Sequence, residues 1–106
     1  MSDFDDVCLL LPTMDEVETV ARVVEDFREV GIDEILVIDG GSTDGTRAAA
    51  TEAGARVVEQ SGRGKGQAVR EAVRDHIEAP YVVMADADAT YDAADIDAML
   101  NPLLAG

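Results

Sequence analysis

The sequence is short of positive charge, and of lysine above all. Its 106 residues include 8 Lys and Arg against 23 Asp and Glu, which gives a formal net charge of -15. A field of that sign repels phosphate backbones, so we expect no nucleic-acid partner. The acidic residues are spread along the chain and do not form a tail, as in the proteins of a halophile.

The sequence also has few aromatic residues, a single cysteine and no long apolar run. Aromatic residues make up only 4% of the chain, so its 47% of apolar residues must build a core from Val, Leu, Ile and Ala. Cys8 is the single cysteine; it can form no internal disulfide, and we expect it in the core. No apolar run approaches the roughly 18 residues of a membrane span, and no signal peptide is visible. We therefore expect a cytoplasmic location.

Apolar patterns predict alternating strands and helices. The strands are expected at 7–12, 34–39, 55–60 and 81–86, and the helices at 17–30, about 45–53, after the loop 61–66, and about 93–104. This order, with short loops and continuous apolar strands, predicts an α/β fold with a mostly parallel sheet flanked by helices.

Side-chain spacing predicts which helix faces are buried. The first helix should bury Val17, Val20, Ala21, Val24, Phe27 and Val30, with Thr13 or Asp15 as its cap and Gly31 at its end. The third helix should bury Ala68, Val69, Ala72, Val73 and Ile77. The last helix should bury Ile96, Met99, Leu100 and Leu103.

Polar segments follow all four predicted strands. They read "PTMDE", "DGGSTDGT", "GRGKG" and "DADATYD" in chain order. Because ligands of parallel sheets bind beyond the carboxyl ends of the strands, these segments predict one binding site.

The second of these segments begins with an aspartate. Asp39 could accept hydrogen bonds from a nucleobase or a ribose, and Gly40 and Gly41 leave room for a flat ligand. Alternatively, this is a strand–helix turn in which Ser42 and Asp44 cap the next helix.

The third segment holds the only lysine of the chain, Lys65, beside Arg63. Its glycines, these cations and a helix N-terminus suggest contact with an anion. It is not the loop that binds nucleoside triphosphates, because Gly66 stands where that motif needs Ser or Thr.

The fourth segment carries aspartates one residue apart, Asp86 and Asp88, which could share a divalent cation on a diphosphate. A calcium-binding loop fits poorly, because Tyr91 stands where glycine is required and Asp97 where glutamate is. The pattern also resembles the nucleophile motif of haloacid-dehalogenase-type phosphatases, which usually lies on the first strand. A solvated helix start is a further alternative, and it accounts best for Asp92, Asp95 and Asp97.

Taken in order, "LPTMDE", "VIDGGSTDGT", "GRGKG" and "DADATYD" resemble the family 2 glycosyltransferases of GT-A fold. The likeness is greatest to the dolichyl-phosphate mannose or glucose synthases. It implies transfer of a hexose, with inversion, from a GDP or UDP sugar to an acceptor such as a polyprenyl or dolichyl phosphate, with Mg²⁺ or Mn²⁺ on the diphosphate. A non-catalytic nucleotide-binding module is the alternative.

The resemblance also implies roles for particular residues. Asp88 would bind the metal, with Asp86 near the metal or the ribose. The nucleotide sugar would contact Pro12, Met14, Glu16, Asp39, Gly41, Arg63 and Lys65. No catalytic residue is assigned. Met14, Asp15 and Gly40 depart from the family's usual Tyr, Asn and Asp, which bears on base stacking and nucleotide choice.

Family members continue well beyond the DxD motif, whereas this chain ends about one helix after it. We therefore expect residues 1–106 to form a nucleotide-sugar-binding half that lacks the acceptor-binding half and turnover of its own. A full-length form could work at the cytoplasmic membrane face. The edge of a shortened sheet could also support a homodimer.

Overall fold

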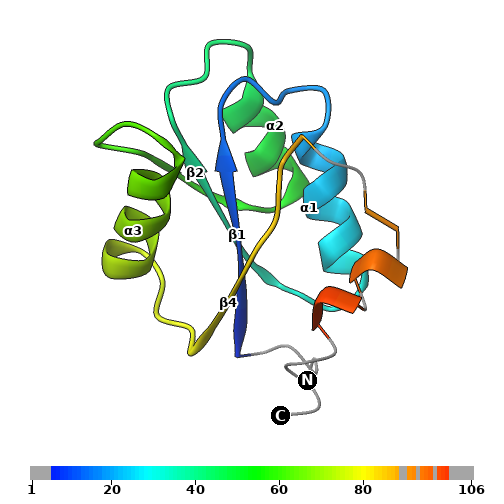
Figure 1. Cartoon of the computed structure of the whole chain (residues 1–106). Helices are drawn as coiled ribbons and strands as arrows, with labels where there is room; N and C mark the ends of the chain where they lie inside the picture. Colours follow the sequence, from blue (N-terminus) through cyan, green and yellow to red (C-terminus); the bar gives the residue numbers. More distant parts are fainter. Residues whose placement is uncertain (1–5, 89–90, 93, 97, 101–106) are drawn as a thin grey trace.

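The computed structural model describes residues 6–88, 91–92, 94–96 and 98–100, without the side chain of Lys65. Four strands form one sheet in the order β3-β2-β1-β4, and every neighbouring pair is parallel. The strands are β1 (Val7–Thr13), β2 (Glu34–Asp39), β3 (Arg56–Glu59) and β4 (Tyr81–Met84), and the helices are α1 (Val20–Glu29), α2 (Thr46–Ala53) and α3 (Lys65–Asp75). The predicted parallel α/β sheet is confirmed (Figure 1).

Both faces of the sheet are covered, because alternate residues of β1 point to opposite sides. Leu9 and Leu11 belong to a core cluster with Phe27 of α1 and Ala50 of α2. Cys8 and Leu10, which are two residues apart and point to the other side, belong to a second cluster that includes Ala68 and Ala72 of α3. Figure 1 shows α3 on one side of β1 and α1 on the other.

Cys8 is a core residue, as predicted. It is fully buried, and burial, reinforced by the charge of Glu34, raises the pKa of its thiol to about 11. The group therefore stays protonated at neutral pH and serves packing.

The predicted start of the first helix is wrong. α1 begins at Val20, and Val17 is 37% exposed. Neither predicted cap serves it: the Thr13 hydroxyl donates to Asp39, and the Asp15 carboxylate accepts from the Thr43 N–H. These bonds hold the segment before α1 in a loop. The predicted end is confirmed, because Gly31 follows the helix with a φ of 108°.

The predicted inner face of α3 is partly wrong. Ala68 and Ala72 are buried, but Val73 is 49% exposed and Glu71 is buried in its place. The cause is a set of hydrogen bonds from Ser61 to the Glu71 carboxylate, which turn that side chain toward the loop before the helix.

The last predicted helix lies only partly within the described residues. Residues 94–96 and 98–100 are helical, and Ile96 and Leu100 are buried, as predicted. Leu103 and the predicted bounds at 93 and 104 lie outside the described residues.

The two central strands are buried almost throughout, while the edge strand β4 exposes Tyr81, Val82 and Met84. Among the described residues, none of the helices is both long enough and apolar enough to cross a bilayer.

Candidate functional site

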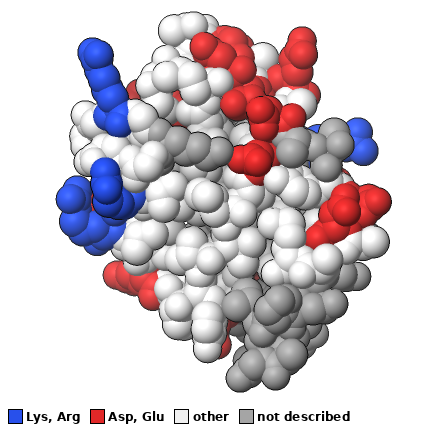
Figure 2. All heavy atoms as spheres, in the orientation of Figure 1, with Lys and Arg blue, Asp and Glu red and all other residues white. Residues whose placement is uncertain are grey.

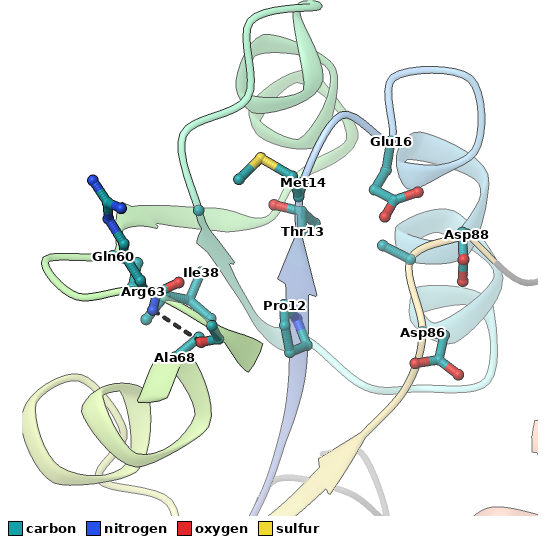
Figure 3. A pocket seen from close by; sticks show the side chains of 13 residues that line it. Pro12, Thr13, Met14, Glu16, Ile38, Gln60, Arg63, Ala68, Asp86 and Asp88 are labelled. Atoms are coloured by element: carbon teal, nitrogen blue, oxygen red, sulfur yellow. Dashed lines mark hydrogen bonds between the residues drawn. The ribbon is translucent and has the colours of Figure 1, made fainter. Parts of the chain in front are cut away.

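A cavity of about 600 Å³ opens at the carboxyl end of the sheet. Its walls come from the ends or following loops of all four strands and from the start of α3 (Figure 3). The lining residues are Pro12, Thr13, Met14, Glu16, Ile38, Gly40, Gln60, Arg63, Gly64, Ala68, Asp86, Ala87 and Asp88. The four polar segments thus meet at one place, as the strand order predicts.

Most of the predicted site residues line this cavity: Pro12, Met14, Glu16, Arg63, Asp86 and Asp88. Asp39 and Gly41 are not among the lining residues. Lys65 begins α3 directly after the lining residue Gly64, and its side chain lies outside the described part of the chain. The sequence interpretation missed Gln60, although its place at the end of a predicted strand was the available signal.

Asp39 organises the turn after β2. Its side chain is fully buried, and Oδ1 accepts hydrogen bonds from the hydroxyls of Thr13 (2.7 Å) and Ser42 (2.6 Å). Oδ2 accepts from the N–H groups of Gly41 (3.0 Å) and Ser42 (2.8 Å). Each oxygen of the carboxylate thus has two donors, which matches its lone pairs.

The charge of Asp39 is stabilised despite its burial. Burial raises the pKa of the carboxyl, but the hydrogen bonds from Ser42, Thr13 and Gly41 outweigh that effect and hold the pKa below its usual range.

The alternative prediction, that Ser42 and Asp44 cap the helix after this turn, is correct for one of the two residues. Asp44 accepts from the Thr46 N–H at the start of α2, whereas Ser42 serves Asp39.

Hydrogen bonds join the loop after β1 to the loop after β2. The Asp15 N–H donates to Ser42 Oγ (2.8 Å), and the Glu16 N–H donates to Thr46 Oγ1 (2.8 Å). Asp15 has a positive φ of 55°, a conformation that Asp tolerates better than most residues. The two loops thus form one unit that sets the position of Glu16 in the cavity wall.

One side of the cavity is acidic. Glu16, Asp86 and Asp88 lie there in Figure 3, away from Gln60 and Arg63. Burial and the negative charge of Asp88 raise the pKa of the Glu16 carboxyl above its usual range. On this face of the molecule most basic side chains gather at the side of α3, and many of the acidic ones lie above and on the opposite side (Figure 2).

The loop that carries Asp86 and Asp88 is held at two points. The Thr19 hydroxyl donates to the carbonyl oxygen of Ala87 at 2.6 Å. The Asp86 N–H donates to the Tyr91 hydroxyl at 2.9 Å, and the Tyr91 ring packs edge-on against Phe27 with ring centroids 5.4 Å apart. α1 therefore helps to position the acidic loop.

The opposite side of the cavity is held by α3. The Glu71 carboxylate accepts hydrogen bonds from the hydroxyl (2.7 Å) and the N–H of Ser61. These bonds hold the pKa of Glu71 below its usual range, and the bond from the Ser61 hydroxyl has the largest effect. Gln60 Nε2 donates to the carbonyl oxygen of Gly64 at 3.0 Å. The loop that carries Arg63 is therefore fixed at both ends.

Comparison with known families identifies the group to which this arrangement belongs. The family model described as glycosyl transferase family 2 matches residues 8–106. The chain belongs to glycosyl transferase family 2.

Curated proteins with similar sequences are also named as glycosyltransferases or hexose transferases. The chain is 63% identical over 102 residues to glycosyltransferase AglJ of Haloferax volcanii, a match that covers 96% of this chain and 34% of AglJ. It is 38% identical over 90 residues to a dolichyl-phosphate hexose transferase of the same organism, covering 83% of this chain and 39% of that protein. The chain thus spans little more than a third of these two relatives.

Solved glycosyltransferase structures share the fold. A crystal structure of glucosyl-3-phosphoglycerate synthase from Mycobacterium tuberculosis, in complex with Mn²⁺, UDP-glucose and phosphoglyceric acid, superposes with a TM-score of 0.84 at 28% identity. That match covers 94% of this chain and 39% of the synthase. A complex of the same synthase with Mg²⁺ and UDP gives a TM-score of 0.83, with 94% of this chain and 40% of the synthase covered, at 28% identity.

The donor set of the acidic side fits a divalent cation that also binds a diphosphate. Carboxylate oxygens suit Mg²⁺ and Mn²⁺, and Mg²⁺ commonly takes only one or two carboxylates beside substrate phosphates. In the described part of the chain, no group of three or more His, Cys, Asp and Glu side chains is arranged to hold a metal by itself. The pair Asp86 and Asp88 therefore fits a cation shared with a ligand better than a closed structural site.

Proposed function

We propose that this chain is the nucleotide-sugar-binding half of an inverting glycosyltransferase. The observation that carries the proposal is the cavity at the carboxyl edge of the sheet, with Glu16, Asp86 and Asp88 on one side. The UDP-glucose and Mn²⁺ in the structurally similar synthase support it. A second candidate, the phosphatase, has no comparable support.

Each predicted residue has a role in this proposal. Asp88, together with Asp86, would hold Mg²⁺ or Mn²⁺, which when bound neutralises charge on the diphosphate. The nucleotide sugar would contact Pro12, Met14, Glu16, Asp39, Gly41, Arg63 and Lys65. Asp39 and Gly41 do not line the cavity themselves but flank Gly40, which does.

We propose that the whole protein transfers a hexose from a GDP or UDP sugar. An acceptor oxygen attacks the anomeric carbon, the bond from that carbon to the diphosphate oxygen breaks, and the nucleoside diphosphate leaves with inversion. A polyprenyl or dolichyl phosphate is the proposed acceptor, supported by the name of one relative. Such an acceptor is already anionic, so it needs no strong general base. The proposed location is the cytoplasmic face of a membrane.

Titration calorimetry tests the binding step. We expect UDP or GDP to bind the chain in the presence of Mn²⁺, and Asp88→Ala to weaken that binding at least about tenfold, as expected when a charged contact worth over 1.4 kcal/mol is lost. Asp88 is exposed, so the variant should stay folded. Asp33→Ala is the matched control, because Asp33 is an exposed aspartate just before β2, at the other end of the sheet. Absence of nucleotide binding by the unaltered chain would refute the proposal.

We also propose that two copies associate through the edge strand β4, whose exposed Tyr81, Val82 and Met84 support this. Light scattering should then give twice the mass of 11.2 kDa, and Val82→Lys should restore the monomer. A wild-type chain that scatters as a monomer at all concentrations contradicts the dimer.

A further inference from the structure

Gln60 stands at the side of the cavity opposite the acidic residues (Figure 3). It follows β3 directly, and its N–H donates to the carbonyl oxygen of Asp39 at 2.7 Å. This backbone bond places residue 60 beside the start of the turn after β2. Gln60 is half-buried, and it lines the cavity wall.

The orientation of the Gln60 amide is fixed by its partner. Nε2 donates to the carbonyl oxygen of Gly64, and a carbonyl oxygen can only accept. The nitrogen must therefore face Gly64, and Oε1 faces the other way. Among the residues that the structure describes, none donates a hydrogen bond to Oε1.

The space in front of Oε1 is open because residue 40 is a glycine. A Cβ on Gly40 would lie 3.5 Å from Gln60 Oε1 and 3.1 Å from the methyl carbon of Met14. Gly40 does not have a positive φ, so backbone conformation is not what requires glycine there. The absent side chain instead leaves a gap lined by a thioether on one side and an amide oxygen on the other.

The division of the cavity sets the direction of a bound nucleotide. With its diphosphate at the acidic side beside the cation, as proposed above, its base would extend toward Ile38, Ala68 and Gln60. An acceptor oxygen at that end favours a base whose ring nitrogen carries a hydrogen. Uracil and guanine have such an N–H, whereas the corresponding nitrogens of cytosine and adenine are acceptors and would face Oε1 without a hydrogen bond.

We propose that Gln60 selects the base of the nucleotide sugar: its Oε1 accepts the ring N–H of uracil or guanine, and Gly40 leaves the space for that ring to approach. The inference rests on the proposed nucleotide-sugar binding and adds a specificity-determining residue to it. Gln60 acts on recognition and not on the reacting atoms.

Calorimetric titration of UDP, GDP, CDP and ADP with Mn²⁺ tests this choice. The unaltered chain should bind UDP or GDP at least about tenfold more tightly than the matching CDP or ADP, as expected for one hydrogen bond that one base makes and the other leaves unmade. In Gln60→Leu the ratio within each pair should fall to near one. The ratio is the readout because both members of a pair are measured on the same variant, so a general loss of loop order does not change it.

Two further variants separate the explanations. Gly40→Ala keeps Gln60 but fills the gap, so it should also lower the UDP-to-CDP or GDP-to-ADP ratio. Gln67→Leu is the matched control on α3, where Gln67 does not line the cavity, and it should leave the ratios unchanged. A wild-type chain that binds nucleotides without preference, or a Gln60→Leu variant with an unchanged ratio, overturns the inference alone. A wild-type chain that binds no nucleotide overturns the proposed function with it.

Discussion

Replacing Asp39 by asparagine should destabilise the protein strongly although the two side chains have almost the same shape. The carboxylate is fully buried and accepts four hydrogen bonds, two at each oxygen. Asparagine retains one oxygen, which can face the two backbone N–H groups, while its NH₂ faces the hydroxyls of Thr13 and Ser42. All four bonds then lack a charged partner.

The magnitude follows from the difference between charged and neutral hydrogen bonds. That difference is about 1 kcal/mol for each bond, or about 4 kcal/mol for four. Burying a neutral amide costs less free energy than burying a charge, and this difference offsets part of the loss from the four bonds. We therefore expect a net loss of about 2 to 3 kcal/mol, or about 8 to 20 °C in Tm for a domain of this size.

Urea unfolding followed by circular dichroism measures this loss, with Asp33→Asn as the control. Asp33 is exposed, so removing its charge should change the free energy of unfolding by less than about 0.5 kcal/mol. An Asp39→Asn variant as stable as this control would refute the account of four matched donors. Nucleotide titration of the folded variant tests separately whether Asp39 also contacts the base.

The pH dependence gives a second check on Asp39. Its pKa in the folded protein is lower than usual, so its contribution to stability is complete above the unfolded pKa of about 3.9 and is lost as the pH falls below it. Asparagine does not titrate. The stability difference between wild type and Asp39→Asn should therefore be constant well above pH 4 and shrink as the pH falls below about 4.

Three other outcomes are expected. Thr19→Val removes the hydroxyl that holds Ala87 and should weaken Mn²⁺-dependent UDP or GDP binding about fivefold, the equivalent of one lost hydrogen bond; Thr51→Val on α2 is the control, and equal affinities would contradict the anchoring role. Glu71→Gln should lower the hydrogen-exchange protection of the Ser61 amide. In wild type this protection should persist at about pH 4.3, where a free glutamate is half protonated, and decline only at lower pH, because Ser61 lowers the pKa of Glu71; unchanged protection in the variant would count against the contact. Finally, the net charge of -15 predicts that raising KCl from 0.1 to 1 M, which shortens the screening length from about 10 to about 3 Å, raises Tm by about 4 °C or more; a falling Tm would contradict dominant charge repulsion.

The sequence was sufficient to predict the order of the strands and helices and the sheet edge at which the cavity opens. Continuous apolar runs such as those of β1 and β2 identify buried parallel strands with little ambiguity. The polar residues after them, Glu16 and Asp88 among others, then share an edge by topology alone.

The errors arose where tertiary hydrogen bonds override local pattern. Val17 fits the stripe of α1, but the loop before it bonds to Ser42 and Thr46, which lie far along the sequence. Val73 fits the face of α3, but Ser61 turns Glu71 inward instead. Gln60 was missed because an amide at a strand end belongs to no known motif, and its proposed role depends on Gly40, which lies in the turn directly after the neighbouring strand β2.

The bond between Thr13 and Asp39 has a consequence for how the chain finds its fold. These residues are directly paired between β1 and β2, yet they lie 26 positions apart in sequence. If β1 shifted by one residue, Pro12 or Met14 would face Asp39 and supply no hydroxyl, and the apolar faces of the strand would also exchange sides. A buried carboxylate left short of donors costs at least about 1 to 3 kcal/mol. The turn beside the cavity thus also selects against misaligned folding intermediates.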